Sequence, residues 1–188
     1  MDANDRRALL DLLARESYFE RKLTLASGRA SNYYIDCKRA LYLPPGFYLA
    51  GELMLDLVRT EGIEQLGGMA SGALPVTDAI IAAAYRHCYD LVGFFVRKEV
   101  KAHGLQQQIE GAFDGKRRTA VVDDTITTGG SSLQAVAAIR QTGVTVTTAF
   151  ALVERGEGAV AAFAEAGLKY RWLYTAEEIR AAHTASQK

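Results

Sequence analysis

The stretch TAVVDDTITTGGSS, residues 119–132, reads as a strand, a polar loop and the start of a helix. Residues 120–122 form a short apolar run, which is typical of a buried strand in a parallel sheet. The glycine pair at 129–130 lets the backbone adopt positive φ and approach a ligand closely. Ser131 or Ser132 is expected to cap the helix, whose apolar residues follow at helical spacing.

The loop and the two aspartates together indicate the kind of ligand. Exposed N–H groups at a helix start, with the positive end of the helix dipole behind them, favour an anion such as phosphate. Asp123 and Asp124 would repel phosphate, but their carboxylates accept hydrogen bonds from hydroxyl groups. The stretch therefore favours a sugar that carries both a phosphate and a free diol. A Walker-type loop is a poorer match, because its GxxxxGK[ST] pattern does not occur.

The composition is that of an ordinary globular protein. The chain has 188 residues, of which 49% are hydrophobic and 23% charged, and this size suits one α/β domain with a small appendage. Lys+Arg and Asp+Glu both number 22, so no overall basic charge indicates a nucleic-acid partner. Cys37 and Cys88 are expected to be buried thiols in a reducing compartment. Without a signal-peptide pattern or an apolar stretch of membrane-spanning length, the chain is expected to be cytoplasmic and not membrane-bound.

Strands and helices alternate along most of the chain, which predicts an α/β fold with a mainly parallel sheet covered by helices on both faces. The expected helices cover residues 4–16, 44–61, 76–85, 131–142 and 159–166, and a last one begins with a capping box at 175–178. The expected strands cover residues 21–25, 31–37, 65–69, 91–96, 119–124, 144–153 and 170–174, with a long polar segment at 97–116. Residues 1–40 are expected to form a helix and a small hood within a single domain, 1–188. Ligands of such sheets bind beyond the carboxyl ends of the strands, where the two aspartates would lie.

Four stretches resemble motifs of a known family. Residues 119–132 resemble the motif with which type I phosphoribosyltransferases bind 5-phosphoribosyl 1-pyrophosphate (PRPP). Residues 24–36, TLASGRASNYYID, are similar to the N-terminal signature of orotate phosphoribosyltransferases. Residues 95–104, FVRKEVKAHG, are similar to the mobile loop of that family, and residues 153–158, VERGEG, to the strand end that carries its arginine. The four stretches follow in the family's order and span nearly the whole chain.

The resemblance implies transfer of the 5-phosphoribosyl group from PRPP to orotate, giving orotidine 5′-monophosphate and pyrophosphate in pyrimidine biosynthesis. It implies the type I phosphoribosyltransferase fold with an N-terminal hood, a mobile catalytic loop at 97–111 and a homodimer whose subunits share their active sites. Mg²⁺ would be carried mainly by PRPP, with no metal site in the protein. The implied catalytic residues are Lys98, Lys101, His103, Asp123 and Asp124. The implied PRPP-binding residues are Arg97, Lys98, Lys101, His103, Asp123, Asp124, Thr125, Ile126, Thr127, Thr128, Gly129, Gly130 and Ser131. The implied orotate-binding residues are Tyr34, Ile35, Thr127 and Arg155.

Other interpretations stay open. The basic residues of 97–103 could form a solvated surface loop, although long loops in compact domains are more often functional. Arg155 could form a surface ion pair, and residues 116–118 and His87 are expected to be surface or structural. A phosphoribosyltransferase for another base, such as a purine, or a PRPP-sensing regulator on the same fold, are the alternative functions. A guanidinium matches the carboxylate of orotate, so Arg155 favours orotate over a purine.

Two positions depart from the family pattern. Ala26 and Ser71 stand where members often carry lysines that help to hold PRPP. Lys22 is the nearest replacement for the first of these, but four strand residues span roughly 13 Å, which exceeds the reach of its side chain. PRPP binding is therefore expected to depend more on Mg²⁺ and on the cations of the mobile loop.

Overall fold

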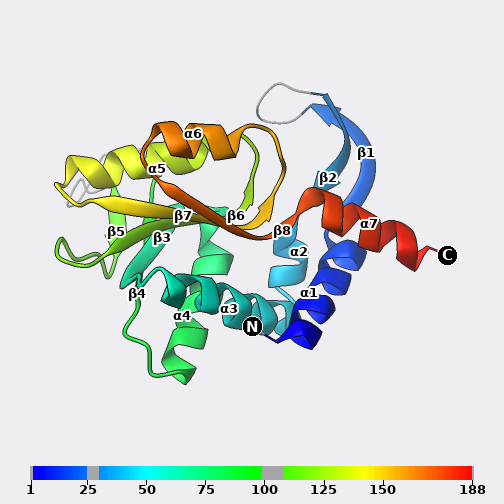
Figure 1. The fold of residues 1–188 in the computed structure, drawn as a ribbon, viewed down its shortest axis with the longest axis horizontal. Coiled ribbons are helices and arrows are strands. Elements are labelled where there is room, and N and C mark those ends of the chain that lie inside the picture. The colour runs from blue at the N-terminus through cyan, green and yellow to red at the C-terminus, as the bar shows by residue number, and fades with distance from the viewer. Residues whose placement is uncertain (1, 25–29, 99–107, 188) are drawn as a thin grey trace.

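The computed structural model describes residues 2–24, 30–98 and 108–187, apart from the side chains of residues 22–24, 30 and 31. A six-stranded sheet in the order β5-β4-β3-β6-β7-β8 forms the centre of the molecule (Figure 1). Its neighbouring strands are parallel except for β4 and β5, so the expected mainly parallel sheet is confirmed. The strands are β3 (Gln65–Met69), β4 (Val92–Val96), β5 (Ile109–Gly111), β6 (Thr119–Ile126), β7 (Val146–Glu154) and β8 (Lys169–Thr175).

Helices cover both faces of this sheet (Figure 1). They are α1 (Ala3–Glu16), α2 (Cys37–Leu41), α3 (Pro44–Thr60), α4 (Ala73–Arg86), α5 (Gly130–Gln141), α6 (Ala159–Glu165) and α7 (Ala176–Ser186). Successive strand residues point to opposite faces, and β6 follows this rule. Ala120 and Val122 join the core formed with α1, α3, α4 and α7, whereas Val121 joins the core formed with α5 and α6. Because both faces are covered, β6 is apolar on both sides up to its two aspartates.

The expected N-terminal hood is a separate two-stranded sheet. Strand β1 (Tyr18–Thr24) pairs antiparallel with β2 (Ala30–Ile35), and both rise beside α1 and α7 (Figure 1). The Tyr18 ring stacks on Tyr33 of β2 and lies 4.8 Å from the ring of His183 on α7. These contacts hold the base of the hood against the first and last helices. The expected turn at 27–29 lies outside the described residues.

The start of α5 differs from the serine cap expected from the sequence. Gly129 occupies the N-cap position at φ +83°, and no side chain caps the helix there. Ser131 and Ser132 already lie in the first helical turn. A left-handed N-cap suits glycine, which lacks the Cβ that opposes positive φ. The capping box expected at the last helix is confirmed, because Thr175 and Glu178 exchange side-chain to backbone hydrogen bonds.

Three further expectations were wrong in detail. No strand was expected within the polar segment 97–116, but Ile109–Gly111 forms the edge strand β5, held by pairing with β4. Cys37 was expected to end a strand and instead opens α2. Cys88 was expected to be buried but is exposed, at a turn where its own φ is +51°.

Among the described residues, no helix combines the length and apolarity needed to cross a membrane.

Candidate functional site

A cavity of about 450 Å³ opens beyond the carboxyl ends of β6 and β7, the edge at which parallel sheets bind ligands. It is bounded by the end of β2, the start of α2, the loop after β6 and the first turn of α5. The residues that line it are Tyr34, Ile35, Lys38, Asp123, Asp124, Thr125, Ile126, Thr127, Thr128, Gly129, Gly130, Ser131, Ser132, Gln134 and Arg155.

Two buried carboxylates form the floor of this cavity. Asp123 and Asp124 are only 8% and 6% exposed. The Asp124 N–H donates to Asp123 Oδ1 over 3.0 Å, and the Thr125 N–H donates to Asp124 Oδ1 over 2.7 Å. Burial raises the pKa of Asp123 well above its ordinary value, and the charge of Asp124 raises it further. The two carboxyl groups offer acceptor oxygens to hydroxyl groups of a ligand.

Lys38 of α2 supplies a cation to this pair, a role that the sequence reasoning missed. Its Nζ lies 3.3 Å from Asp124 Oδ2 and 3.2 Å from Asp36 Oδ1. Burial raises the pKa of Asp124, and the ammonium of Lys38 opposes that rise. Partial burial lowers the pKa of Lys38, but Asp124 and Asp36 outweigh it, so that the pKa lies above its ordinary value. The available signal was a lysine two residues after Asp36, directly behind the aromatic strand.

The N-terminus of α4 approaches the same carboxylates. Gly72 is the N-cap residue of this helix and follows Ser71 in the turn after β3. A Cβ at Gly72 would lie 2.6 Å from Asp123 Oδ1 and 3.2 Å from Asp124 Oδ1. Only a glycine leaves room for both oxygens, and the positive end of the α4 dipole favours their negative charge.

The loop after β6 is shaped for an anion. The left-handed Gly129 turns the chain into α5, and its carbonyl accepts the Leu133 N–H over 2.8 Å. The N–H groups of the first helical turn lack partners within the helix, so they can donate to a phosphate at its N-terminus. Threonine and serine hydroxyls at 127, 128 and 131 border the same space.

An aromatic contact supports this loop from behind. A Cβ at Gly129 would lie 3.1 Å from the Phe163 ring of α6, and that ring lies 4.7 Å from the Tyr170 ring of β8. The Tyr170 hydroxyl donates to the buried carboxylate of Glu154, which also accepts the Gly156 N–H over 2.6 Å. Glu154 directly precedes Arg155. The loop after β6 and the turn after β7 thus rest on one set of side chains.

Arg155 is buried in the wall of the cavity and does not form a surface ion pair. Its side chain is 2% exposed, and its Nε lies 3.1 Å from Glu157 Oε1. The guanidinium lies 4.6 Å from the centroid of the Tyr33 ring, a cation–π contact with the hood. The Arg155 N–H donates to Ile126 O over 3.0 Å, which ties the end of β7 to the end of β6. A planar cation fixed in this way can receive a planar anionic group between the hood and the sheet.

No family model matches the chain. An orotate phosphoribosyltransferase of Rhodopseudomonas palustris strain BisB5 is 39% identical over 177 residues, which cover 92% of this chain and 95% of that protein. An orotate phosphoribosyltransferase of Rhodopirellula baltica is 41% identical over 173 residues, covering 89% and 90%. The crystal structure of Mycobacterium tuberculosis H37Rv orotate phosphoribosyltransferase in complex with PRPP is 35% identical, with a TM-score of 0.78 over 93% of this chain and 98% of that one.

The chain belongs to the orotate phosphoribosyltransferase family. The likeness covers 92% of this chain in the Rhodopseudomonas palustris relative and 93% in the Mycobacterium tuberculosis structure, so it is not confined to the loop after β6. The type I fold that the resemblance implied is thereby shown as well.

The structure gathers most of the residues that the family resemblance implied, and leaves others apart. Asp123, Asp124, the loop residues 125–131, Tyr34, Ile35 and Arg155 all line the cavity, and so do Lys38, Ser132 and Gln134, which were not foreseen. Arg97 and Lys98 follow β4 and do not line it. The Arg97 Nη1 lies 3.2 Å from Glu110 Oε1, and Lys98 is exposed. Lys101, His103, Ala26 and most of the expected mobile loop lie outside the described residues.

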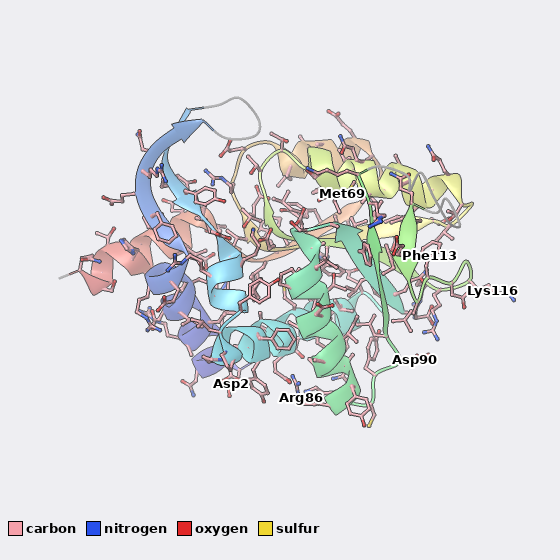
Figure 2. The ribbon with its side chains drawn as sticks, turned by 180° about the vertical axis from the view of Figure 1, so that it is seen from behind. Asp2, Met69, Arg86, Asp90, Phe113 and Lys116 are labelled. Atoms are coloured by element: carbon pink, nitrogen blue, oxygen red, sulfur yellow. The ribbon has the colours of Figure 1, made fainter. Side chains whose placement is uncertain are left out.

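The basic run at 116–118 lies away from the cavity, as expected. Lys116 projects from the periphery of the molecule, on the far side of Phe113 from Met69 at the end of β3 (Figure 2). Arg117 pairs with Asp90 and Arg118 with Glu64. His87, for which a structural or surface place was expected, is exposed and pairs with Glu52.

Proposed function

We propose that this protein transfers the 5-phosphoribosyl group from PRPP to orotate, giving orotidine 5′-monophosphate and pyrophosphate. The observation that carries the proposal is one cavity in which three features meet, in a chain of the orotate phosphoribosyltransferase family. These features are two buried carboxylates, an anion-binding helix start and a buried arginine. The carboxylates suit a diol, the helix start suits a phosphate, and the arginine suits a planar base that carries a carboxylate. PRPP supplies the diol and the phosphate, and orotate supplies the base.

Each part of the cavity has a role in this proposal. Residues 127–131 hold the 5′-phosphate through N–H and hydroxyl groups, and Asp123 and Asp124 accept hydrogen bonds from the ribose hydroxyls. Arg155 pairs with the carboxylate of orotate, whose ring lies against Tyr34 and Ile35 of the hood. A ring nitrogen of orotate attacks the anomeric carbon as the bond to the pyrophosphate oxygen breaks. Positive charge builds on the ribose, as in other glycosyl transfers, and the neighbouring carboxylates stabilise it.

The departing pyrophosphate needs cations from outside the described cavity. Arg97 and Lys98 lie just beyond the carboxyl end of β4, on the same edge of the sheet as the cavity. With Lys101 and His103 they would neutralise the pyrophosphate when the 97–111 loop closes, and closure would exclude water from the activated sugar. This loop would serve the site of a partner subunit in a homodimer.

Mg²⁺ is the proposed cofactor, and it would shield the charge of the pyrophosphate oxygens. Mg²⁺ keeps several waters and binds readily through substrate phosphates. Within residues 2–24, 30–98 and 108–187, no three His, Cys, Asp or Glu side chains group to hold a metal ion. The proposed location is the cytoplasm, where the two free cysteines would stay reduced.

A spectrophotometric assay of orotate loss with PRPP and Mg²⁺ tests the proposal, run beside uracil, adenine and hypoxanthine. We expect loss of orotate alone, with release of one pyrophosphate per orotate consumed. Turnover of a purine with orotate unchanged would favour a phosphoribosyltransferase for another base. PRPP binding without turnover of any base would favour the regulator.

A further inference from the structure

Lys38 is held from two sides at the edge of the cavity. Its Nζ lies between Asp36 Oδ1 and Asp124 Oδ2, at 3.2 and 3.3 Å. Its side chain is 39% exposed, whereas that of Asp124 is 8% exposed. The ammonium therefore bridges a carboxylate of the segment behind the hood and a buried carboxylate of the main sheet.

The short helix α2 fixes the position of this ammonium. The Asp36 side chain caps α2 by accepting the Lys38 N–H over 3.3 Å, and the same oxygen contacts the ammonium. Cys37 Sγ lies 3.2 Å from Thr125 Oγ1, which ties the first turn of α2 to β6 beside Asp124. The lysine thus approaches Asp124 from a helix that is itself anchored on the strand carrying Asp124.

Asp124 needs this partner to keep its charge and its direction. A buried carboxylate is costly unless it is paired and hydrogen-bonded. Here a second buried carboxylate, Asp123, adjoins it, and like charges in one site favour protonation of one of them. Contacts that oppose this include the Thr125 N–H on Oδ1 and the Lys38 ammonium on Oδ2. With both oxygens engaged, the carboxylate cannot turn freely, and its remaining lone pairs stay directed at the cavity.

We propose that Lys38 is a positioning residue of the phosphoribosyl transfer, which holds Asp124 ionised and directed at the ribose hydroxyls of PRPP. It acts through Asp124 and does not itself bind a phosphate, because two carboxylates already compensate its charge. This proposal rests on the proposed function for the identity of the sugar.

A double-mutant cycle separates action through Asp124 from direct contact with PRPP. The dissociation constant of PRPP with Mg²⁺ is measured by calorimetry for wild type, Lys38→Met, Asp124→Asn and the double variant. Loss of a charged hydrogen-bond partner should weaken PRPP binding about 10- to 100-fold in Lys38→Met. In the Asp124→Asn background, the same change should cost about twofold or less, because there is no carboxylate left to orient. Lys38→Arg, which keeps the charge, should recover most of the affinity.

Two controls guard against a merely structural effect. Lys169→Met removes a lysine whose Nζ lies 2.9 Å from Glu61, at the opposite end of the sheet, and should leave PRPP affinity unchanged. Lys38→Gln is measured beside Lys38→Met, and melting temperatures are recorded for every variant. In the steady state, both Lys38 variants should raise KM for PRPP at least tenfold more than KM for orotate.

An equal cost of Lys38→Met in both backgrounds would overturn the proposal, and so would equal rises in both KM values. Loss of the fold in both Lys38→Met and Lys38→Gln would also overturn it, because Lys38 would then be structural. Binding is measured without orotate, so the cycle is independent of turnover. A wild-type chain that binds PRPP but leaves orotate unchanged would refute the proposed function while the cycle still decides the role of Lys38.

Discussion

Replacement of Gly72 by alanine should damage the site far more than the fold. The added Cβ would lie 2.6 Å from Asp123 Oδ1, whereas an ordinary contact begins near 3.4 Å, so the oxygen must move by about 0.8 Å (3.4 − 2.6). That oxygen also accepts the Asp124 N–H, so the shift disturbs both carboxylates. A misplacement near 1 Å costs about 100-fold in rate, so we expect kcat/KM for PRPP to fall by about that factor. Crowding should lower the free energy of unfolding by only about 1–3 kcal/mol, offset in part by the smaller entropy of the unfolded alanine chain.

Steady-state kinetics and thermal unfolding of the same preparation test this reasoning. Gly115→Ala is the matched control, because a Cβ there would meet only Val144 Cγ2, at an ordinary 3.9 Å. That variant should keep its activity. A Gly72→Ala enzyme with wild-type kcat/KM would refute the argument, because the reaction would then tolerate the displacement of Asp123 that the added Cβ imposes. A variant that loses its fold and activity together would refute it equally.

Three further predictions concern the substrates, the partner subunit and pH. Arg155→Lys should raise KM for orotate much more than KM for PRPP, since a point charge cannot replace a planar fork stacked on Tyr33, and steady-state kinetics with equal rises would point to a structural role. If sites are shared across a dimer, mixing Lys101→Ala subunits with Asp123→Ala/Asp124→Ala subunits should restore roughly a quarter of wild-type activity. Half of the dimers are then mixed, and each mixed dimer has one intact site. Activity that stays at the level of the separate variants after subunit exchange would argue against sharing. Burial raises the folded-state pKa of Asp123, so the free energy of unfolding falls as the pH rises from the ordinary pKa to the raised one. The Asp123→Asn variant should therefore have a higher melting temperature than wild type at pH 8. This difference in melting temperature should narrow as the pH falls through the raised pKa towards the ordinary one. A difference that widens in acid would contradict the reasoning.

The main sheet could be predicted because its signals are local. The apolar runs of β3 and β6 and the alternation of strands with helices specify a covered parallel sheet without knowledge of any contact. The carboxylates and the glycine loop were found for the same reason, since they adjoin one another in the chain. Motif order then indicated Arg155, which lies about thirty residues further on.

The missed features depend on contacts between distant segments. Lys38 meets Asp124 across 86 residues of chain, and α2 is too short to show helical periodicity. Strand β5 has three residues and exists because β4 offers it an edge, so a polar segment gave no sign of it. The prediction of a serine cap was wrong because Gly129 adopts a left-handed conformation and starts the helix without a side-chain cap.

The aromatic support behind Gly129 has a consequence for any attempt to redesign this enzyme for another base. Phe163 lies against the position of Gly129, and through Tyr170 it is linked to Glu154, the residue that precedes Arg155. A substitution at Arg155 that changes the preference for the base therefore also affects the side chains that support the sugar-phosphate loop. Specificity for the base and affinity for the sugar donor cannot be tuned one at a time at this corner. A successful redesign has to change α6 and β8 together with the turn after β7.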